Sequence, residues 1–430
     1  MKSSLYNYYV NDKDNVIIFN GLTEASFRIG ERNADVFKAI IESPDKFVED
    51  FKPFIDKMKG DGFIIEDGFN EEEVVRNKYD YIRHGEEYMA MILSTYQCNL
   101  RCWYCTQDHA DSWMSDETVR RIKKRIEKEL RKDAIKHLSI SWFGGEPLLA
   151  YDRVVEISRW AKEFAEELGK GFGAVITTNG TLLNRKRVEE LRDAGINYYQ
   201  ITIDGNRETH NNVKILGKDS AYDRTIENIG YIIEHTHCTL RFNYTKENLK
   251  PESLIKDLDE ALSKENREKI SFLIYKVWQE KAAEISQVEI DKLMELAFNI
   301  GITPKLAEGG MCYVDKKKFD CIFANGNVGK CDNESPEDRN GILTESGDIE
   351  WISDISAHRS ILEYENCECK DCRFLPLCWG PCTAKRETML KEKGKIVCQF
   401  DNKDFQMSRM IRNKHVNKEF SKKKIEKENY

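Results

Sequence analysis

The sequence predicts an α/β protein built around a partial (β/α)6 barrel of the TIM type, with a small winged-helix-like domain before it and a cysteine-rich domain after it. Three observations support this prediction. Strand and helix patterns alternate over residues 88–302, and residues 1–87 have a different order of elements. Nine of the thirteen cysteines lie between Cys312 and Cys398, within residues 303–430. A chain of 430 residues is long enough for several domains of ordinary size.

The first block, residues 1–87, has the element order of a winged helix. Two short apolar runs flank a turn at Gly21, and two apolar sets with helical spacing follow. Gly60 and Gly62 then interrupt the chain before a last short apolar run. The expected strands are residues 16–19, 25–29 and 63–65, the expected helices cover residues 36–41 and 47–58, and residues 71–87 are expected to form a surface helix or a linker.

The middle block predicts six successive β–α units, which form a parallel sheet covered by outer helices. One expected helix has Val119, Ile122 and Ile126 on a single face. Because six units are fewer than the eight of a closed barrel, we expect an open sheet with functional residues at the carboxyl ends of its strands. The expected strands are residues 89–94, 138–143, 174–178, 198–204, 239–244 and 270–277.

Composition excludes several classes of protein. The net charge is −8, so no basic surface indicates nucleic-acid binding. No apolar run is long enough to predict a membrane span, and the polar first residues lack the apolar core of a signal peptide. We therefore expect a cytoplasmic protein whose cysteines do not form disulfides. The basic tail from Lys414 to Lys427 is expected to be solvated and partly disordered.

The first group of cysteines has the sequence Cys98-Asn-Leu-Arg-Cys102-Trp-Tyr-Cys105 and follows directly on the first expected strand of the barrel. Three thiolates at this spacing wrap one [4Fe–4S] cluster and leave its fourth iron open to an exogenous ligand. An open position is typical of a catalytic metal centre rather than a structural one. The alternative is a zinc site, for which His109 is the candidate fourth ligand.

The CxxxCxxC loop, with the aromatic Tyr104 before its last cysteine, resembles the radical S-adenosylmethionine (SAM) superfamily. The resemblance implies that Cys98, Cys102 and Cys105 hold the cluster and that the open iron binds the amino and carboxylate groups of SAM. One electron would then cleave SAM to methionine and a 5′-deoxyadenosyl radical, which abstracts hydrogen from the substrate. The protein would position the reactants and exclude water.

Further segments resemble the SAM-binding motifs of that superfamily. Glu146, in a Gly-Gly-Glu turn after the second strand, would accept hydrogen bonds from the SAM ammonium group. Lys214 stands where the family often has Arg, and it lacks the planar fork of Arg. Arg241 and Asn243 either face the SAM ribose or satisfy a polar network inside the barrel. The resemblance gives cofactor-binding roles to Tyr104, Gly144, Gly145, Glu146, Asn179, Thr202, Lys214, Arg241, Asn243 and Val277.

The second group of cysteines resembles the SPASM domain of radical SAM peptide and protein maturases, in which eight cysteines hold two auxiliary [4Fe–4S] clusters. Cys367 is left over by this pattern and is an alternative to Cys369. Zinc is the alternative metal. Metal binding would stabilise a segment that is poor in apolar patterns. By resemblance one cluster is held by Cys312, Cys321, Cys331 and Cys382, and the other by Cys369, Cys372, Cys378 and Cys398.

Asp332 follows Cys331 directly. In the related anaerobic sulfatase-maturating enzymes an Asp at the matching position acts as a general base, so the resemblance implies the same role for Asp332. The alternative is a turn residue, because Asn333 follows it.

The expected function is that of a radical SAM maturase that installs an oxidative crosslink, a thioether or a carbon–carbon bond, in a ribosomally synthesised precursor peptide. The first block resembles the precursor-recognition element of such maturases, which binds a leader peptide as an added strand. The expected partners are this peptide and an electron donor of the flavodoxin or ferredoxin type, with no nucleic acid and no membrane. The alternatives are an anaerobic sulfatase-maturating enzyme that oxidises Cys or Ser to formylglycine, and a non-catalytic iron–sulfur or zinc binding protein.

Overall fold

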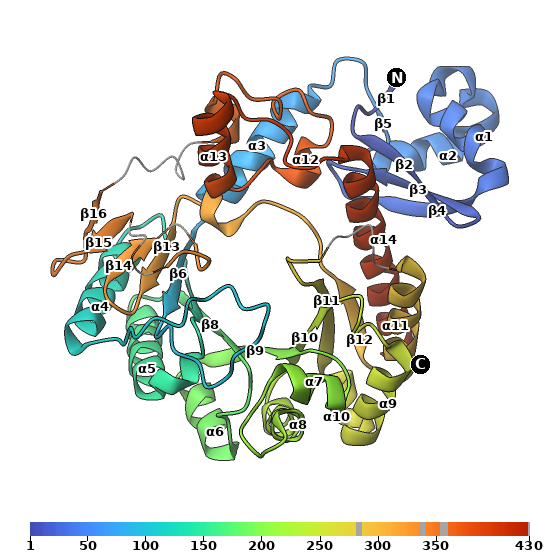
Figure 1. Cartoon of the computed structure of the whole chain (residues 1–430). Coiled ribbons are helices and arrows are strands. Elements are labelled where there is room, and N and C mark those ends of the chain that lie inside the picture. The colour runs from blue at the N-terminus through green and yellow to red at the C-terminus, as the bar shows by residue number, and fades with distance from the viewer. Residues whose placement is uncertain (281–285, 330, 336, 338–339, 353–359, 429–430) are drawn as a thin grey trace. The chain divides into compact units, whose positions relative to one another are not determined.

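The structure, a computed structural model, describes residues 1–280, 286–329, 331–335, 337, 340–352 and 360–428 (Figure 1). The chain divides into two compact units. The first, here called the terminal unit, comprises Met1–Gly85, Glu308–Lys317 and Ser356–Tyr430. The second, the barrel unit, comprises Glu86–Ala307 and Lys318–Ile355. Residues of the expected cysteine-rich domain therefore occur in both units.

A parallel sheet forms the centre of the barrel unit and confirms the α/β class. All six expected strands are present, and each pairs in parallel with the next along the chain. A seventh parallel strand at the sheet edge was missed, because it is short and contains Pro304, and a proline within a run argues against a strand. The strands are β6 (Glu87–Leu93), β7 (His137–Phe143), β8 (Gly171–Thr178), β9 (Ile196–Ile203), β10 (Cys238–Tyr244), β11 (Ile270–Lys276) and β12 (Thr303–Leu306).

The sheet continues beyond β6 with strands from the cysteine-rich segment, whose sequence is poor in apolar patterns. β13 (Phe319–Phe323) pairs in parallel with β6. All five of its residues are buried, so it lacks the alternation that identifies a half-exposed strand. Antiparallel neighbours follow at β14 (Asn327–Gly329), β15 (Gly341–Leu343) and β16 (Ile349–Trp351). Within the described residues the sheet runs from β12 to β16 and does not close, as expected for a partial barrel.

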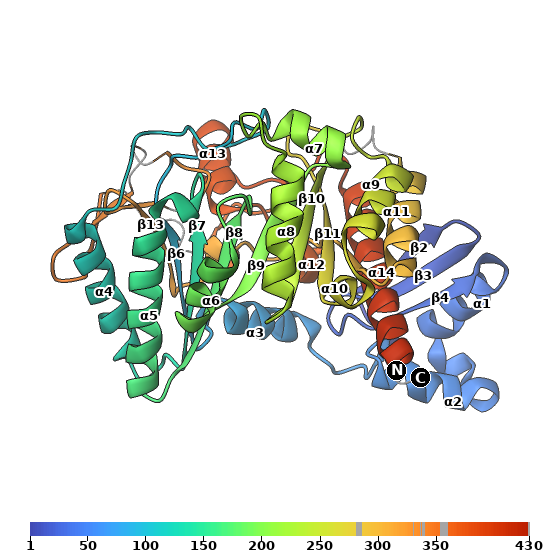
Figure 2. The same ribbon diagram turned by 90° about the horizontal axis from the view of Figure 1, so that it is seen from below.

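Helices cover the outer face of the parallel strands (Figure 2). The helix at Asp116–Leu130 confirms the expected apolar face, since Val119, Ile122 and Ile126 are buried. Its first turn is capped by the Ser115 side chain, which accepts a hydrogen bond from Thr118 N. The helices are α4 (Asp116–Leu130), α5 (Tyr151–Glu167), α6 (Arg185–Asp193), α7 (Arg207–Val213), α8 (Ala221–Ile233), α9 (Pro251–Ala261), α10 (Lys264–Glu268) and α11 (Gln287–Asn299).

The terminal unit begins with an antiparallel sheet of order β2-β3-β4. The expected strands and helices of this block are present, and the sequence missed only the first two strands, which lie in its polar start. One side of the sheet packs on α1 and α2 through apolar side chains such as Ile18, Ile40 and Phe63. The elements are β1 (Lys2–Ser3), β2 (Asn7–Asp12), β3 (Asn15–Asn20), β4 (Ser26–Gly30), α1 (Glu31–Glu42), α2 (Val48–Gly60), β5 (Ile64–Ile65) and α3 (Glu71–His84).

Helix α3 is the surface helix that was expected over residues 71–87, but one of its faces is buried. Its residues Glu71, Val75, Tyr79 and Arg83 are buried. Glu71 accepts hydrogen bonds from Ser4 Oγ at 2.5 Å and from Leu5 N at 2.9 Å. A high content of charged residues was therefore a poor guide to exposure, because part of this charge is satisfied inside the unit.

The cysteine-rich segment of the terminal unit shares one hydrophobic core with β2 and β3. The Tyr8 ring stacks on Phe374 with centroids 5.1 Å apart, and the Tyr8 hydroxyl donates to Arg373 O. The Arg373 guanidinium in turn donates to Asn7 O at 2.7 Å. A buried ion pair of 2.5 Å between Arg386 and Asp315 lies in the same unit. The helices of this segment are α12 (Leu375–Cys378), α13 (Thr383–Lys393) and α14 (Lys403–Glu428).

Helix α14 corrects the prediction of a solvated, partly disordered tail, because the first part of that segment is buried and only residues 421–427 are mostly exposed. Lys414, His415 and Asn417 are all buried, with exposed fractions below one tenth. Lys414 pairs with Glu24 at 3.3 Å and with Glu308 at 3.2 Å. Lys414 is therefore held by carboxylates that lie far away in the sequence.

In the part of the chain that the structure describes, no helix combines the length and the apolar character that crossing a bilayer requires.

The shared core predicts that β2 and the cysteine-rich segment lose stability together. Replacing Tyr8, which is 2% exposed, by Ala should lower the free energy of unfolding of the terminal unit by about 3–5 kcal/mol, because a buried ring is removed. Tyr8→Phe keeps the ring and should cost only about 1 kcal/mol. Urea unfolding measures the free energy of unfolding of both variants, and hydrogen exchange shows whether residues 7–20 and 369–379 lose protection together. Loss of protection in residues 7–20 alone would contradict a common core.

Candidate functional site

The loop after β6 carries the first three cysteines. Cys98 and Cys102 are half-buried, and Cys105 is exposed. Burial raises the pKa of the Cys98 thiol to about 11, although a hydrogen bond from Leu100 N opposes the shift. Burial also raises the pKa of Cys102, and Lys214 opposes it. These thiols become thiolates only when a cation takes the place of the proton, as metal binding provides.

The two glycines after β7 hold this loop in place. Gly145 N donates to Thr95 O at 3.0 Å, and the next amide donates to Gln97 O at 2.9 Å. A Cβ on Gly144 would lie 2.2 Å from Thr95 O, and one on Gly145 would lie 2.3 Å from Gln97 O. Gly144 also has φ +129°, which side-chain-bearing residues rarely adopt. The chain that approaches these glycines is therefore the start of the cysteine loop.

Glu146 is fully buried and joins the ends of β7 and β8. Its Oε1 accepts from Thr178 Oγ1 at 2.7 Å and from Leu148 N at 3.0 Å, and its Oε2 accepts from Asn179 N at 2.9 Å. Burial raises the pKa of Glu146, and these hydrogen bonds partly offset the shift. Three donors leave about one further acceptor position on the carboxylate.

Asn179 connects the end of β8 with the cysteine loop. Its Nδ2 donates to Asn99 Oδ1 at 2.9 Å and lies 3.9 Å from Cys98 Sγ. Its Oδ1 accepts from Thr181 N at 2.9 Å. The loop is thus held from two sides, by backbone bonds to the glycine turn and by side-chain bonds to Asn179.

Lys214 is a buried cation beside the second thiol. Its Nζ donates to Thr202 Oγ1 at 2.7 Å, pairs with Asp204 at 3.2 Å and lies 3.9 Å from Cys102 Sγ. Burial acts to lower the pKa of Lys214, but the effects of Asp204, Tyr104 and Cys102 are larger together. The net result is a pKa above the usual value. Lys214 therefore stays protonated at neutral pH, with Asp204 as its counter-charge.

Tyr104 extends this polar network to β10. Its hydroxyl donates to Asp204 Oδ1 at 2.6 Å and accepts from Asn243 Nδ2 at 3.2 Å. Arg241 Nε donates to Asn243 Oδ1 at 2.9 Å, and its guanidinium lies 3.9 Å from the Tyr275 ring centroid. Burial lowers the pKa of Arg241. Arg241 and Asn243 thus form part of a polar network inside the barrel unit.

Val277, directly after β11, is buried and donates from its amide to Tyr244 O at 3.0 Å. Two residues further on, Gln279 Nε2 donates to Tyr104 O at 3.2 Å. The end of β11 therefore also contacts the cysteine loop.

Asp332 lies in the barrel unit next to the continuation of the cysteine loop. Its carbonyl accepts from Gln107 Nε2 at 2.6 Å. Asn333 Oδ1 accepts from Thr106 Oγ1 at 3.2 Å. The residues after Cys105 are therefore tied to the residues after Cys331, a contact between distant segments that no sequence pattern indicated.

The pattern of the Radical SAM superfamily matches residues 92–267, which span β6 to α10 and all of the contacts between the cysteine loop and Lys214. This part of the chain is a radical SAM domain. Such a domain uses a [4Fe–4S] cluster and SAM. The residues present fit these groups: three thiols lie on one loop, and a protonated Lys214 beside Cys102 favours thiolate ligands.

Several curated proteins match part of this chain. The chain is 30% identical over 210 residues to the Fe-coproporphyrin III synthase of Methanosarcina barkeri, covering 47% of this chain and 49% of the relative. It is 36% identical over 133 residues to the AdoMet-dependent heme synthase of the same organism, covering 31% and 35%. The probable GTP 3′,8-cyclase of Methanocaldococcus jannaschii is 30% identical over 186 residues, covering 42% and 56%. The chain thus spans about half the length of these relatives or less.

Two solved structures have a similar fold. The native anSMEcpe structure with bound AdoMet and Cp18Cys peptide has a TM-score of 0.54 at 18% identity, covering 78% of this chain and 100% of that one. Streptococcus suis SuiB bound to S-adenosylmethionine has a TM-score of 0.50 at 18% identity, covering 93% and 100%. At this level of identity the likeness concerns the fold alone.

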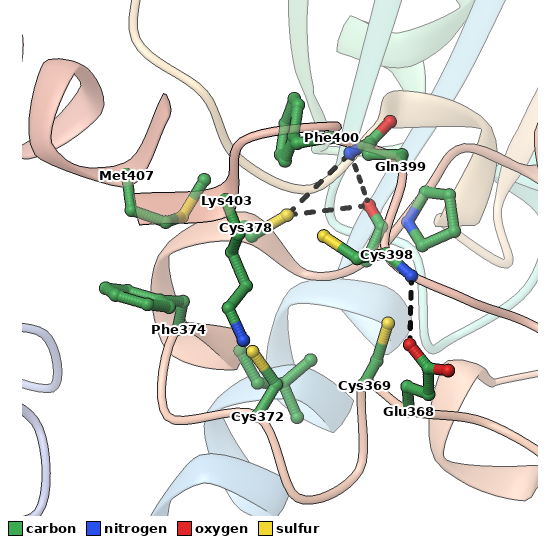
Figure 3. A pocket seen from close by; sticks show the side chains of 13 residues that line it. Glu368, Cys369, Cys372, Phe374, Cys378, Cys398, Gln399, Phe400, Lys403 and Met407 are labelled. Carbon is green, nitrogen blue, oxygen red and sulfur yellow. Dashed lines mark hydrogen bonds between the residues drawn. The ribbon is translucent and has the colours of Figure 1, made fainter. Parts of the chain in front are cut away.

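Outside the radical SAM domain, four cysteines of the terminal unit line one cavity (Figure 3). Its volume of about 60 Å³ exceeds that needed by a single water molecule. Apolar side chains such as Phe374, Phe400 and Met407 complete its wall. The four are Cys369, Cys372, Cys378 and Cys398.

The remaining cysteines of the SPASM pattern are divided between the units. Cys312 and Cys382 belong to the terminal unit, and Cys321 and Cys331 belong to the barrel unit. Cys367, the leftover cysteine, is buried in the same core as Cys369. Among the described residues, no three His, Cys, Asp or Glu side chains converge on one metal ion.

Sequence reasoning gave no role to Asp204 or to His210, which lie between Thr202 and Lys214 in the sequence. Asp204 is fully buried, and its amide donates to His210 Nδ1 at 3.3 Å. Asn248 Nδ2 donates to Asp204 O and to Asn243 O, each at 3.0 Å. The Asp-Gly…His spacing was the available signal, but only the contacts reveal that these residues support Lys214 and Tyr104.

His210 predicts a pH dependence of stability. Burial, with a contribution from Lys214, lowers the pKa of His210 from 6.5 to about 3. In the unfolded state His210 has its ordinary pKa of 6.5, so it is protonated there first as the pH falls. The contribution of His210 to stability is therefore complete above pH 6.5 and is lost as the pH falls toward 3. Between pH 6.5 and about pH 5 the loss amounts to about 2 kcal/mol. His210→Asn keeps an acceptor for Asp204 N but cannot titrate, so its unfolding free energy should vary less with pH. Urea unfolding at matched cluster content tests this, and equal slopes for the two proteins would refute it.

Proposed function

We propose that this chain is a radical SAM maturase that installs an oxidative crosslink, a thioether or a carbon–carbon bond, in a ribosomally synthesised precursor peptide. The observation that carries the proposal is the cavity lined by Cys369, Cys372, Cys378 and Cys398 in a chain that also has a radical SAM domain. Four thiols around one cavity fit an auxiliary [4Fe–4S] cluster of the SPASM kind.

In this proposal Cys98, Cys102 and Cys105 hold the SAM-binding cluster. When bound, the cluster and SAM supply a 5′-deoxyadenosyl radical that abstracts hydrogen from the peptide. The chain itself positions these groups: the glycine turn and Asn179 fix the cysteine loop, and Lys214 places a positive charge beside it. Further contacts to SAM are assigned to Tyr104, Gly144, Gly145, Glu146, Asn179, Thr202, Arg241, Asn243 and Val277.

Glu146 keeps its proposed role as acceptor for the SAM ammonium group through the acceptor capacity that its three donors leave. Because its carboxylate also joins the ends of β7 and β8, its replacement would disturb the loop as well as the cofactor.

The eight SPASM cysteines would hold two auxiliary clusters, with Cys312, Cys321, Cys331 and Cys382 as the second ligand set. We assign to Asp332 the role of general base during substrate oxidation. Its half-buried position and the bond from Gln107 Nε2 to its carbonyl support a fixed place near the end of the cysteine loop. The electron donor would be of the flavodoxin or ferredoxin type.

Strand β4 supplies an edge for a leader peptide. Asn20 N donates to Ala25 O, and Glu31 N donates to Asp14 O. In the antiparallel register of β3 and β4, these two bonds imply that the amides and carbonyls of Ser26 and Arg28, and the Gly30 amide, point away from β3. An extended peptide can pair with such outward groups as an additional strand.

Peptide chemistry also receives support from a fold neighbour, because the anSMEcpe structure contains a bound peptide. The first competing function is that of an anaerobic sulfatase-maturating enzyme, which oxidises Cys or Ser to formylglycine. A non-catalytic iron–sulfur or zinc protein is the second. The curated relatives are named for haem-related and nucleotide chemistry, so the substrate class has to be tested directly.

Anaerobic reconstitution tests the cluster assignment. We expect about twelve irons per chain, from three four-iron clusters, and release of 5′-deoxyadenosine from SAM under reduction. A variant with Cys98, Cys102 and Cys105 replaced by Ala should lose about four irons and all deoxyadenosine. Cys372→Ala with Cys398→Ala should lose about four irons while deoxyadenosine release persists. Bound zinc, or the absence of deoxyadenosine from the fully loaded protein, would remove the enzyme function.

Co-expression with small open reading frames of the same locus then tests the substrate class. The intact mass of the product peptide should fall by the mass of two hydrogens for each crosslink. Conversion of a Cys or Ser to an aldehyde would instead establish the sulfatase-maturating alternative.

Gly30 allows the strand-addition hypothesis to be tested with little disturbance of the fold. Its φ of −61° suits proline, and a Cβ there meets nothing within 4 Å. Gly30→Pro removes an outward-facing N–H and should weaken binding of the leader peptide about two- to tenfold. Fluorescence polarisation of a labelled leader measures the affinity.

Gly30→Ala is the matched control, because it keeps the amide hydrogen at the same position. If Gly30→Pro binds the leader as tightly as Gly30→Ala, the peptide does not pair with the β4 edge.

A further inference from the structure

Gln399 lies against one of the four thiols that line the cavity of the terminal unit. Its Nε2 is 3.7 Å from Cys378 Sγ and 3.4 Å from Gly380 O (Figure 3). Both contacts are of hydrogen-bond type, so the amide group faces the cavity with its donor side. Gln399 itself is half-buried and follows Cys398 directly.

The orientation of this amide is determined by Lys385 on α13. Lys385 Nζ donates to Gln399 Oε1 at 3.4 Å. Because an ammonium group has donors and no acceptor, it must face the amide oxygen. The amide nitrogen therefore has to face Cys378, and the reverse orientation would place two donors against each other.

Other polar groups around the cavity act less directly on its sulfurs. Lys403 lines the cavity, and in Figure 3 its side chain runs toward Cys372. Lys403 is exposed, however, so water and salt screen its charge. Glu368 accepts a hydrogen bond from Cys398 N at 3.4 Å and pairs with Lys395 at 3.3 Å, which turns its charge toward the surface.

We propose that Gln399, held by Lys385 as a positioning residue, raises the reduction potential of the cluster bound by Cys369, Cys372, Cys378 and Cys398. This inference rests on the proposed function, because it requires a cluster in the cavity. It concerns the direction of electron flow: a cluster of higher potential is the better acceptor for the electron that an oxidised substrate releases.

The physical reason is the change of charge on reduction. One added electron makes the cluster and its four thiolates more negative, and a hydrogen bond to a ligating sulfur stabilises the more negative state. Phe374, Phe400 and Met407 add no hydrogen-bond donor to this wall, so Gln399 acts on the Cys378 sulfur together with the backbone of Gly380. Loss of the Gln399 donor should therefore lower the potential.

The experiment measures midpoint potentials by titration with dithionite, followed by electron paramagnetic resonance. The full chain with Cys98, Cys102 and Cys105 replaced by Ala is reconstituted, so that the SAM-binding cluster does not contribute. In this background we compare Gln399→Leu, which removes the donor, with Lys385→Met, which removes only the residue that orients it. The matched controls are Gln406→Leu on α14 and the exposed Lys391→Met on α13, neither of which lines the cavity.

One of the midpoint potentials should shift downward in Gln399→Leu and downward by a smaller amount in Lys385→Met. The other potential, and both potentials in the control variants, should remain unchanged. If Gln399→Leu lowers the iron content, Lys385→Met carries the test, because Lys385 is outside the cavity wall. Unchanged potentials in a variant with full iron content would overturn the inference.

The iron content of Cys372→Ala with Cys398→Ala in the same background separates this inference from the proposed function. Loss of one cluster in that variant together with unshifted potentials in Gln399→Leu and Lys385→Met refutes only the role of Gln399. Iron content equal to that of the parent protein means that no cluster occupies the cavity, and then the proposed auxiliary cluster and the role of Gln399 both fail.

Discussion

The close backbone contact between the glycine turn after β7 and the start of the cysteine loop is the constraint on which the site depends. Gly144 and Gly145 lie so near the carbonyls of Thr95 and Gln97 that neither position has room for a side chain. The path of the loop is therefore set before any thiol binds a metal. Asn179 ties the opposite side of the loop through Asn99. Three cysteines on a free loop would have to be ordered at the moment of cluster binding, whereas here much of that entropy is already lost on folding.

The sequence was sufficient where local chemistry decides the structure. The six central strands were predicted because strand and helix patterns alternate over residues 88–302. Glu146 was singled out because the Gly-Gly-Glu turn after the second strand resembles a SAM-binding motif of the radical SAM superfamily. It was insufficient where distant residues decide. Helix α14 is a largely polar helix: Met407, Met410 and Ile411 pack in the core of the terminal unit, and Lys414 can be buried because it pairs with Glu24 and Glu308. Likewise, the network of Asp204 and Tyr104 depends on a contact between β9 and a loop one hundred residues earlier, which no local pattern encodes.

The terminal unit joins two features that the sequence suggested separately. Tyr8 of β2 stacks on Phe374, and Phe374 also lines the four-cysteine cavity. The strand that begins the antiparallel sheet therefore packs on the wall of the cavity, within one hydrophobic core. Because a packed core transmits strain, a change in the Cys369–Cys378 segment would alter the support of β2 and, through β3, of the edge strand β4. Under the proposed function, metal binding in the cavity and peptide binding at β4 would therefore be physically coupled rather than independent.

The two cysteine sites stabilise negative charge on sulfur in different ways. At Cys102 the chain uses a whole charge, since Lys214 Nζ lies 3.9 Å from the sulfur. A buried ammonium group is costly unless it is paired, and this explains why Asp204, Tyr104 and Asn243 surround it. Asp204 also cancels much of the field that Lys214 exerts on the thiol, so the pair acts largely as an oriented dipole. At Cys378 the amide of Gln399 provides such a dipole without a buried charge, and the exposed Lys385 only has to hold its orientation. The arrangement at Cys378 needs no buried counter-charge. It is therefore compatible with a cavity wall that consists chiefly of aromatic and aliphatic side chains.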